Sequence, residues 1–288
     1  MDVNRVKTWV LIAGLGGLFV LIGGLIGGTN GAVIALVIAL VFNFAMYWYS
    51  DKIAIATTRS KPVTEAEYPE LFRIVRELTS AKGMPMPRIY VSEMAQPNAF
   101  ATGRSPQHAA VSVTKGILQV LDEREMRGVL AHELSHVMNR DILIGSVAAA
   151  IAMSITFLAR FAFFFGGSRD DRNNPLGPFA LILAWVLAPI AAALIQMAMS
   201  RSREYQADES GAYLSHDPEA LASALRKIEI AAGRVPAPAT VSPAQAHMFI
   251  INPFKGRSGQ AAGFANLFST HPPTEARIAR LEQIAEKL

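Results

Sequence analysis

The sequence contains no cysteine, which excludes a disulfide, a thiolate nucleophile and any metal site built on cysteine ligands. Charged residues are also scarce, at 17% of the 288 residues, whereas hydrophobic residues reach 51%. This balance is too apolar for an ordinary soluble protein and indicates segments that lie in a membrane. The formal net charge of +4 is small and spread along the chain, so it gives no support for a nucleic-acid partner.

Charge is absent altogether from Thr8 to Ser50. As one continuous helix this segment would be about 65 Å long, which is twice what a single bilayer crossing needs. Backbone-permissive and turn-forming residues cluster in its middle, at 27–31. Residues 1–50 are therefore expected to form a transmembrane hairpin with spans at about 9–27 and 32–50.

A second pair of apolar runs predicts another transmembrane hairpin over 142–199. Its spans are expected at about 142–160 and 179–199, on either side of the polar loop "GGSRDDRNNP". A buried core helix is the alternative for any single run, but four such runs fit poorly inside one soluble core.

The distribution of Lys and Arg predicts which side of the membrane each segment faces. Arg5 precedes the first span, Lys52 follows the second and Arg201 follows the fourth, whereas the tip of the first hairpin has no basic residue. Under the positive-inside rule, both termini and the soluble segments 51–141 and 200–288 face the cytoplasm. The expected location is a membrane that the chain crosses several times, with the lipid bilayer as a partner.

The soluble segments predict a mainly helical domain with a small sheet. "TEAEYPELFRIVRELTSAKGMP" has the apolar spacing of a helix, and "PRIYVSE", "NAFATG" and "AAVSVT" have the composition of three strands. A further helix is expected after Asp122, which forms a capping pair with Glu125, and its apolar residues repeat as far as Met138. Two more helices are expected, one after Asp217 and one at the C-terminus.

The stretch "AHELSHVMNRD" places His132 and His136 four residues apart, with Glu133 beside the first. On a helix these histidines lie one turn apart on the same face, so both imidazoles can bind one ion, and nitrogen ligands suit zinc. Glu133 lies about 100° round the helix, where a carboxylate can take a proton from water at the metal. This pattern arises by chance in roughly one such chain in a hundred, so it indicates a zinc site.

A catalytic zinc ion takes three protein ligands and keeps a fourth position for water. Glu204 in "REYQAD" is the candidate third ligand, and Asp208, one turn later, could accept a hydrogen bond from a ligand histidine. The alternative for this pair is an ordinary solvated helix face. The predicted topology favours the metal site, because the second hairpin returns the chain to the side of the membrane where "HELSH" lies.

Together, "AHELSHVMNRD", "SREYQADESGA", "PNAFATGR" and "THPPTEAR" among four predicted spans resemble the HtpX family of membrane-embedded zinc endopeptidases. The resemblance covers essentially the whole chain and implies a zincin-like α+β protease domain with one zinc ion per chain. It implies that His132, His136 and Glu204 bind the metal, that Glu133 is the general base, and that Asp208 supports a ligand histidine. The implied role is stress-related quality control at the inner membrane of a bacterium, in which misfolded or damaged membrane proteins are the substrates.

Two further motifs are candidates for roles in catalysis and substrate binding. His271 in "HPP" could donate to the oxyanion, with Arg277 as a more distant candidate, or His271 could simply mark the turn into the last helix. Asn98, Ala99 and Phe100 could belong to an edge strand to which an extended substrate adds, or to an ordinary sheet strand. The resemblance favours the substrate-binding strand.

Three other functions compete with an endopeptidase that degrades damaged proteins. A CaaX-type processing protease would need a prenylated partner and, in that family, a larger set of spans than four. A catalytically silent scaffold could keep zinc for stability, but it would not need Glu133 between the histidines. A transporter would need polar residues buried along several spans, and few are present.

Overall fold

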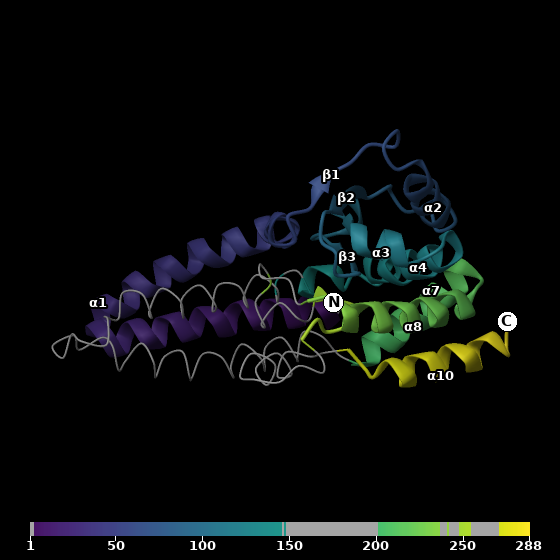
Figure 1. The fold of residues 1–288 in the computed structure, drawn as a ribbon. Coiled ribbons are helices and arrows are strands. Elements are labelled where there is room, and N and C mark those ends of the chain that lie inside the picture. Colours follow the sequence, from purple (N-terminus) through teal and green to yellow (C-terminus); the bar gives the residue numbers. More distant parts are fainter. Residues whose placement is uncertain (1–2, 146, 148–200, 237–240, 242–247, 255–270) are drawn as a thin grey trace.

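The structure is a computed structural model, which describes residues 3–145, 147, 201–236, 241, 248–254 and 271–288. The predicted third and fourth spans, at 142–160 and 179–199, lie outside these residues except for 142–145 and 147. Figure 1 shows a long helical hairpin that projects from a domain built of a small sheet and several helices.

The hairpin is helix α1 (Val3–Thr57), which reverses direction at Gly27 and Gly28. Gly28 has φ 59° and ψ −146°, a backbone conformation that only glycine adopts without strain. The predicted break at 27–31 was too long, because two glycines suffice for the reversal and Thr29, Asn30 and Gly31 are already helical. The helix of the second arm extends to Thr57, seven residues beyond the position at which the second membrane span is predicted to end.

Small residues let the two arms of α1 approach closely. A Cβ atom added to Gly31 would lie 2.1 Å from the backbone oxygen of Gly23. Further along, the Asn43 side chain donates to the backbone oxygen of Ile12 at 3.2 Å. Within the described residues, one helical segment, Gly27–Ala45, is long and apolar enough to cross a membrane, whereas the apolar helix Ile12–Leu21 is shorter.

The sheet has four strands in the order β1-β2-β4-β3: β1 (Lys61–Pro62), β2 (Arg88–Ser92), β3 (Ala99–Thr102) and β4 (Ala110–Thr114). β2 and β4 are parallel, and the other two pairs are antiparallel. The prediction of β2, β3 and β4 is confirmed, whereas β1 is too short to show any alternation. β3 lies at the edge of the sheet.

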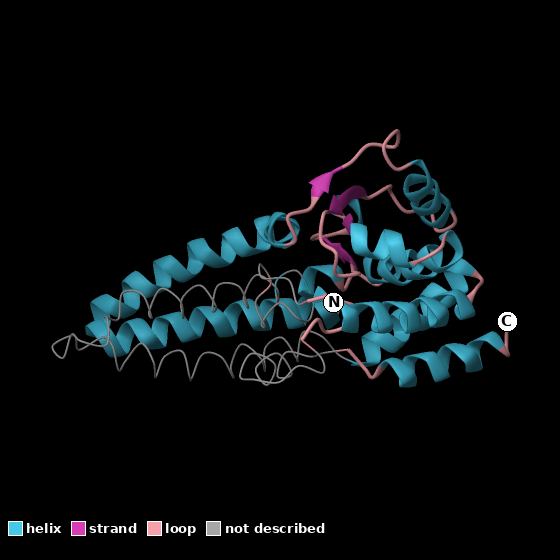
Figure 2. Ribbon diagram, viewed as in Figure 1, coloured by secondary structure: helices cyan, strands magenta, loops and turns pink. Residues whose placement is uncertain are grey.

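The described helices of this domain cover one side of the sheet (Figures 1 and 2). They are α2 (Pro69–Ser80), α3 (Lys115–Val120), α4 (Glu123–Met138), α7 (Arg201–Ser215), α8 (Pro218–Arg234) and α10 (Thr274–Ala285), and a short 3₁₀ turn, η1 (Pro106–His108), lies in the connection between β3 and β4. The predicted helix starts are confirmed at Asp122, which forms a capping box with Glu125, and at Asp217, which caps α8.

Helix α4 is central, with β3 on one side and α7 and α8 on the other. Glycines allow the close contacts between these helices. A Cβ atom on Gly128 of α4 would lie 2.8 Å from the backbone nitrogen of Leu221 in α8, and one on Gly211 of α7 would lie 2.9 Å from the backbone nitrogen of His132. The backbone of α7 therefore lies directly against the start of the "HELSH" motif.

Candidate active site

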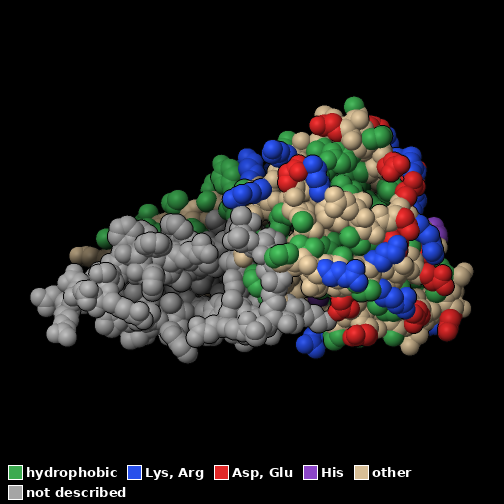
Figure 3. Space-filling view, in the orientation of Figure 1, with side chains coloured by type: hydrophobic (Ala, Val, Ile, Leu, Met, Phe, Trp, Pro, Cys, Tyr) green, Lys and Arg blue, Asp and Glu red, His purple; other side chains and the backbone are tan. Residues whose placement is uncertain are grey.

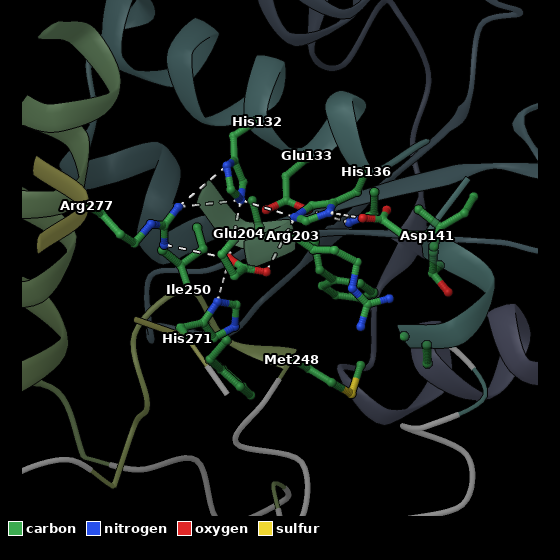
Figure 4. Close-up of a pocket in the computed structure, with 18 residues that line it drawn as sticks. His132, Glu133, His136, Asp141, Arg203, Glu204, Met248, Ile250, His271 and Arg277 are labelled. Carbon is green, nitrogen blue, oxygen red and sulfur yellow. Dashed lines mark hydrogen bonds and ion pairs between the residues drawn. The ribbon is translucent and has the colours of Figure 1, made fainter. Parts of the chain in front are cut away.

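Three side chains from α4 and α7 converge on one point (Figure 4). His132 and His136 project from the same face of α4, and Glu204 faces them from the first turn of α7. One ligand atom from each of the three lies within 4.8 Å of the other two. The prediction that the two distant motifs meet is confirmed.

The spacing of these atoms fits zinc. The Nε2 atoms of His132 and His136 are 3.3 Å apart, and they lie 3.8 Å and 3.7 Å from the two carboxylate oxygens of Glu204. Ligands about 2.0–2.1 Å from a tetrahedral zinc ion are separated by roughly 3.3 Å. Two imidazoles and one carboxylate are also the ligand set of a known class of catalytic zinc sites.

His132 is oriented by two buried residues from α7 and α10. Its Nδ1 donates to the Asp208 carboxylate at 2.9 Å, and Arg277 donates to both oxygens of the same carboxylate, at 2.9 Å from Nε and 2.6 Å from Nη2. Burial disfavours the charged form of Asp208, but Arg277 and His132 outweigh it and lower its pKa to about 2. The carboxylate is therefore charged, and the Nε2 of His132 points toward Glu204.

His136 is oriented by a different carboxylate. Its Nδ1 lies 3.0 Å from Oδ2 of Asp141, which follows α4 after a left-handed residue, Arg140 (φ 55°). Burial lowers the pKa of His136, but Asp141 outweighs burial and raises it to about 10. At neutral pH and without a metal, the ring is therefore in its protonated, positively charged form. Metal binding would displace the extra proton.

Glu204 is charged for a similar reason. Burial raises the pKa of this carboxylate, but His271 and His136 outweigh burial and hold it well below its usual value. His271 Nδ1 lies 2.8 Å from one Glu204 oxygen. The "HPP" motif thus places a histidine inside the pocket, just before α10 begins.

Glu133 lies beside the three clustered side chains and faces the sheet. The side chain is buried, and one carboxylate oxygen accepts the backbone N–H of Ala101 in β3 at 2.9 Å. This hydrogen bond shows that the outer edge of β3 faces the cluster. A carboxylate in this position is fixed beside the metal-ligand cluster without belonging to it.

Asn98 holds a loop against the start of β3. Its side-chain nitrogen donates to the backbone oxygen of Met248, and its side-chain oxygen accepts from the backbone nitrogen of Ile250, both at 3.0 Å. The side chain is fully buried. Ala99 and Phe100, the other two residues predicted to bind substrate, line the pocket together with the 248–250 loop.

Sequence reasoning missed two charged residues in this pocket and gave a third a different role. The sequence patterns assign no role to Asp141 or Arg203, and they suggest Arg277 as a donor to the oxyanion rather than as the partner of Asp208. The sequence offers only a weak signal for each, because the contact of Asp141 depends on the turn at Arg140 and the partner of Arg277 lies 69 residues away.

Arg203 and Asp141 also have unused hydrogen-bonding capacity. Both terminal nitrogens of Arg203 and Oδ1 of Asp141 are buried and have no hydrogen-bond partner among the described residues. Burial lowers the pKa of Arg203. Its guanidinium turns away from the cluster toward Met248 (Figure 4), so the pocket holds both a donor and an acceptor for a further polar group.

Comparison with known proteins gives the family context. Residues 65–285 match peptidase family M48. The chain is 53% identical to "Protease HtpX homolog" of Ralstonia pickettii over 98% of this chain and 97% of that protein. It is 55% identical to the protein of the same name in Paraburkholderia phytofirmans, with the same coverage.

A solved structure shares the fold. The crystal structure of S. mikatae Ste24p superposes with a TM-score of 0.52 over 97% of this chain, at 19% identity. The chain spans 65% of the length of that protein. Both therefore share an architecture, although Ste24p has a substantial part that this chain does not match.

Proposed function

The chain belongs to peptidase family M48 and is a membrane zinc protease, and from this premise we propose that it is an endopeptidase for misfolded or damaged membrane proteins. It would act at the inner membrane of a bacterium, in protein quality control under stress. The observation that carries the proposal is the meeting of His132, His136 and Glu204 beside Glu133 and the edge strand β3.

In the proposed mechanism, His132, His136 and Glu204 hold one zinc ion per chain. Bound zinc supplies Lewis acidity, which polarises the scissile carbonyl and makes the attacking water more acidic. Glu133 takes a proton from that water and passes it to the nitrogen of the leaving amine. The N–H of Ala101 keeps the Glu133 carboxylate in place for both transfers.

His271 is the proposed donor to the oxyanion. It lines the pocket beside the metal-ligand cluster, with its Nδ1 at 2.8 Å from a Glu204 oxygen, so its ring is placed near a carbonyl held at the metal. Arg277 is assigned a different role, because its guanidinium is occupied by Asp208. It keeps Asp208 charged, and Asp208 keeps the Nδ1 proton on His132.

The edge strand β3 is the proposed site at which the substrate backbone binds. Asn98 accepts from Thr114 in β4, so the alternation of an antiparallel pair turns the backbone groups of Ala99 and Ala101 outward, away from β4. A substrate strand could pair with the outward groups of Ala99 and with the outward carbonyl of Ala101, while the Ala101 N–H stays bonded to Glu133. Such pairing requires an extended segment, which a misfolded protein exposes and a folded one hides.

Arg203 and Asp141 are proposed to bind the substrate backbone at one end of this strand. A peptide unit offers one acceptor and one donor, which matches the unused nitrogens of Arg203 and the unused oxygen of Asp141. Both residues line the same pocket as Glu133. Backbone recognition of this kind is independent of side-chain sequence, as degradation of varied damaged proteins requires.

The proposed membrane arrangement has four spans with both termini and the pocket on the cytoplasmic side. Ile142 and Arg203, at the two ends of the intervening segment, line the same pocket. This placement supports an even number of crossings between them. Residues 51–141 and 200–288 would then form one protease domain, completed across the second transmembrane hairpin.

The decisive experiment compares the purified protein with its Glu133→Gln variant, each with and without zinc. We expect the wild type to cleave unfolded casein and a misfolded membrane protein only with zinc. The variant should bind zinc equally well and lose at least about 99% of activity, since general-base catalysis contributes roughly 10²–10⁴-fold. If the variant cuts as fast as the wild type, the assignment of Glu133 fails.

The same preparation tests the CaaX-type alternative, with which the structural likeness to Ste24p is compatible. A prenylated peptide and its unprenylated twin are offered as substrates. A clear preference for the prenylated peptide, with no cleavage of casein, would replace the quality-control function with a processing function.

The absence of native cysteine also allows single-cysteine labelling at Asn30 and Lys287 to test the proposed orientation.

A further inference from the structure

A second hollow lies outside the catalytic pocket, where the end of α1 meets the connection between β3 and β4. Its volume is about 700 Å³, and its lining includes Phe44, Trp48, Lys52, Arg88 and Arg104. Figure 3 shows Lys and Arg side chains gathered where the hairpin joins the domain. The hollow thus combines positive charge with aromatic rings at the base of an apolar helix.

The positive charge of this hollow is only partly neutralised. Arg88 forms an ion pair with Asp51 at 2.8 Å. Lys52 and Arg104 have no carboxylate partner in the part of the chain that the structure describes. Arg104 instead lies over the Trp48 ring at 4.5 Å. An anion would therefore find two available cations, one from α1 and one from the β3–β4 connection.

The neighbouring surface is suited to lipid chains. Leu40, Val41 and Phe44 on the second arm of α1 are 62%, 66% and 64% exposed, and they belong to the segment able to cross a membrane. Trp48 lies one turn beyond Phe44, where aromatic rings sit at the level of lipid headgroups. The hollow therefore opens at the height where a phosphate group and its acyl chains would lie together.

We propose that this hollow binds the headgroup of an anionic phospholipid, with its phosphate between Lys52 and Arg104 and its acyl chains along the exposed face of α1. The inference rests on the proposed placement of α1 in the membrane with this end at the cytoplasmic surface. Cytoplasmic-leaflet lipids carry the required charge, and basic pockets beside membrane helices recognise such headgroups.

Binding there would also act on the catalytic pocket. Only Gly103 separates Arg104 from the end of β3. Gly103 has a φ of 140° and lies close to the backbone oxygen of His108, and both features fix the conformation of the β3–β4 connection. A Cβ atom on Gly103 would lie 2.5 Å from that oxygen. A headgroup that holds Arg104 would therefore steady the strand that carries Ala101 and, through it, Glu133.

The test measures lipid binding by the full-length protein in nanodiscs of phosphatidylcholine with a minor fraction of phosphatidylglycerol. Native mass spectrometry gives the ratio of the two lipids that remain bound. A double variant, Lys52→Gln with Arg104→Gln, is compared with Arg226→Gln and Arg280→Gln together. These controls remove the same charge from exposed positions on α8 and α10.

We expect the anionic lipid to be enriched on the wild type and on the control variant. The test variant should lose about fivefold in retention per cation, or roughly thirtyfold in all, since each basic residue at a membrane surface contributes about this much. If the test and control variants lose anionic-lipid retention equally, the proposed site is overturned, because general attraction to the charged protein surface would explain the enrichment. Displacement of the lipid by equimolar glycerol phosphate would overturn the proposal that the ligand is a lipid and would show that the hollow binds a free phosphate instead.

All measurements are repeated in a Glu133→Gln background. Lipid retention there should be unchanged, because the proposed site does not use the catalytic residues. A result in which the protein binds the lipid but cleaves nothing would leave this inference intact while the proposed proteolytic function fails. The opposite result, cleavage without selective lipid retention, would refute the lipid site alone.

Discussion

The two histidines of α4 are held in opposite ways. His132 depends on Asp208 and Arg277, which come from α7 and α10 and are 0% and 2% exposed. His136 depends on Asp141, which lies five residues along the chain and keeps one oxygen open to the pocket. The difference indicates that the orientation of His132 depends on the assembly of the whole domain, whereas that of His136 depends on a local contact that lines the pocket.

Replacement of Arg277 should break the His132 side and have the largest effect. Arg277→Met leaves Asp208 buried without its counter-ion, which is expected to cost about 3–5 kcal/mol of stability. Thermal unfolding in detergent should show a large fall in Tm, and metal analysis a loss of zinc. Arg280→Met, on the exposed face of the same helix, should cost no more than about 1 kcal/mol. Similar losses in the two variants would contradict the role of Arg277.

Gly211→Ala should also disturb the surroundings of His132, in this case by overpacking. The added methyl would lie 2.9 Å from the backbone of His132, and such overpacking costs about 1–3 kcal/mol. Gly233→Ala in α8 is the matched control, because a Cβ atom there has no neighbour within 4 Å. That variant should gain up to about 1 kcal/mol from helix propensity. The two variants should therefore shift Tm in opposite directions.

Asp141→Asn should affect the His136 side without unfolding the domain. Loss of a carboxylate behind a ligand histidine weakens metal affinity by about 10–100-fold. Titration against a chelator of known affinity measures this change, and the Tm of the zinc-free protein should stay close to that of the wild type. A fall in Tm as large as that of Arg277→Met would mean that the two sides are equally structural.

Arg203→Gln should have the smallest effect and should appear in substrate binding alone. Loss of one hydrogen bond to the substrate backbone corresponds to about 0.5–1.5 kcal/mol, or roughly a two- to tenfold rise in KM. The zinc content and kcat should not change. A fall in kcat at constant KM would instead place Arg203 in the catalytic step.

Local patterns predicted much of this fold. Helical spacing together with Asp122 and Glu125 located α4, and residue composition located β2, β3 and β4. These patterns are local because periodicity and capping depend on neighbours within a few residues. The two-residue strand β1 has no such pattern, and the hairpin turn proved shorter than its cluster of turn-forming residues.

The candidate site was predictable only in part. Fixed spacing on one helix revealed His132 and His136, and the topology argument joined them to Glu204. The pairing of Arg277 with Asp208 crosses 69 residues of sequence and depends on how α10 packs, which no local pattern records. Asp141 was missed because its contact with His136 depends on the left-handed turn at Arg140.

The division of the site between two halves of the chain also has a consequence in time. During synthesis His132 and His136 are made first, but Glu204 follows only after the 142–200 segment, and Arg277 lies close to the C-terminus. A partly made chain therefore lacks the third ligand and the counter-ion that complete the pocket. A chain that stops before Arg277 is therefore expected to be inert, because the pocket cannot be completed without this residue.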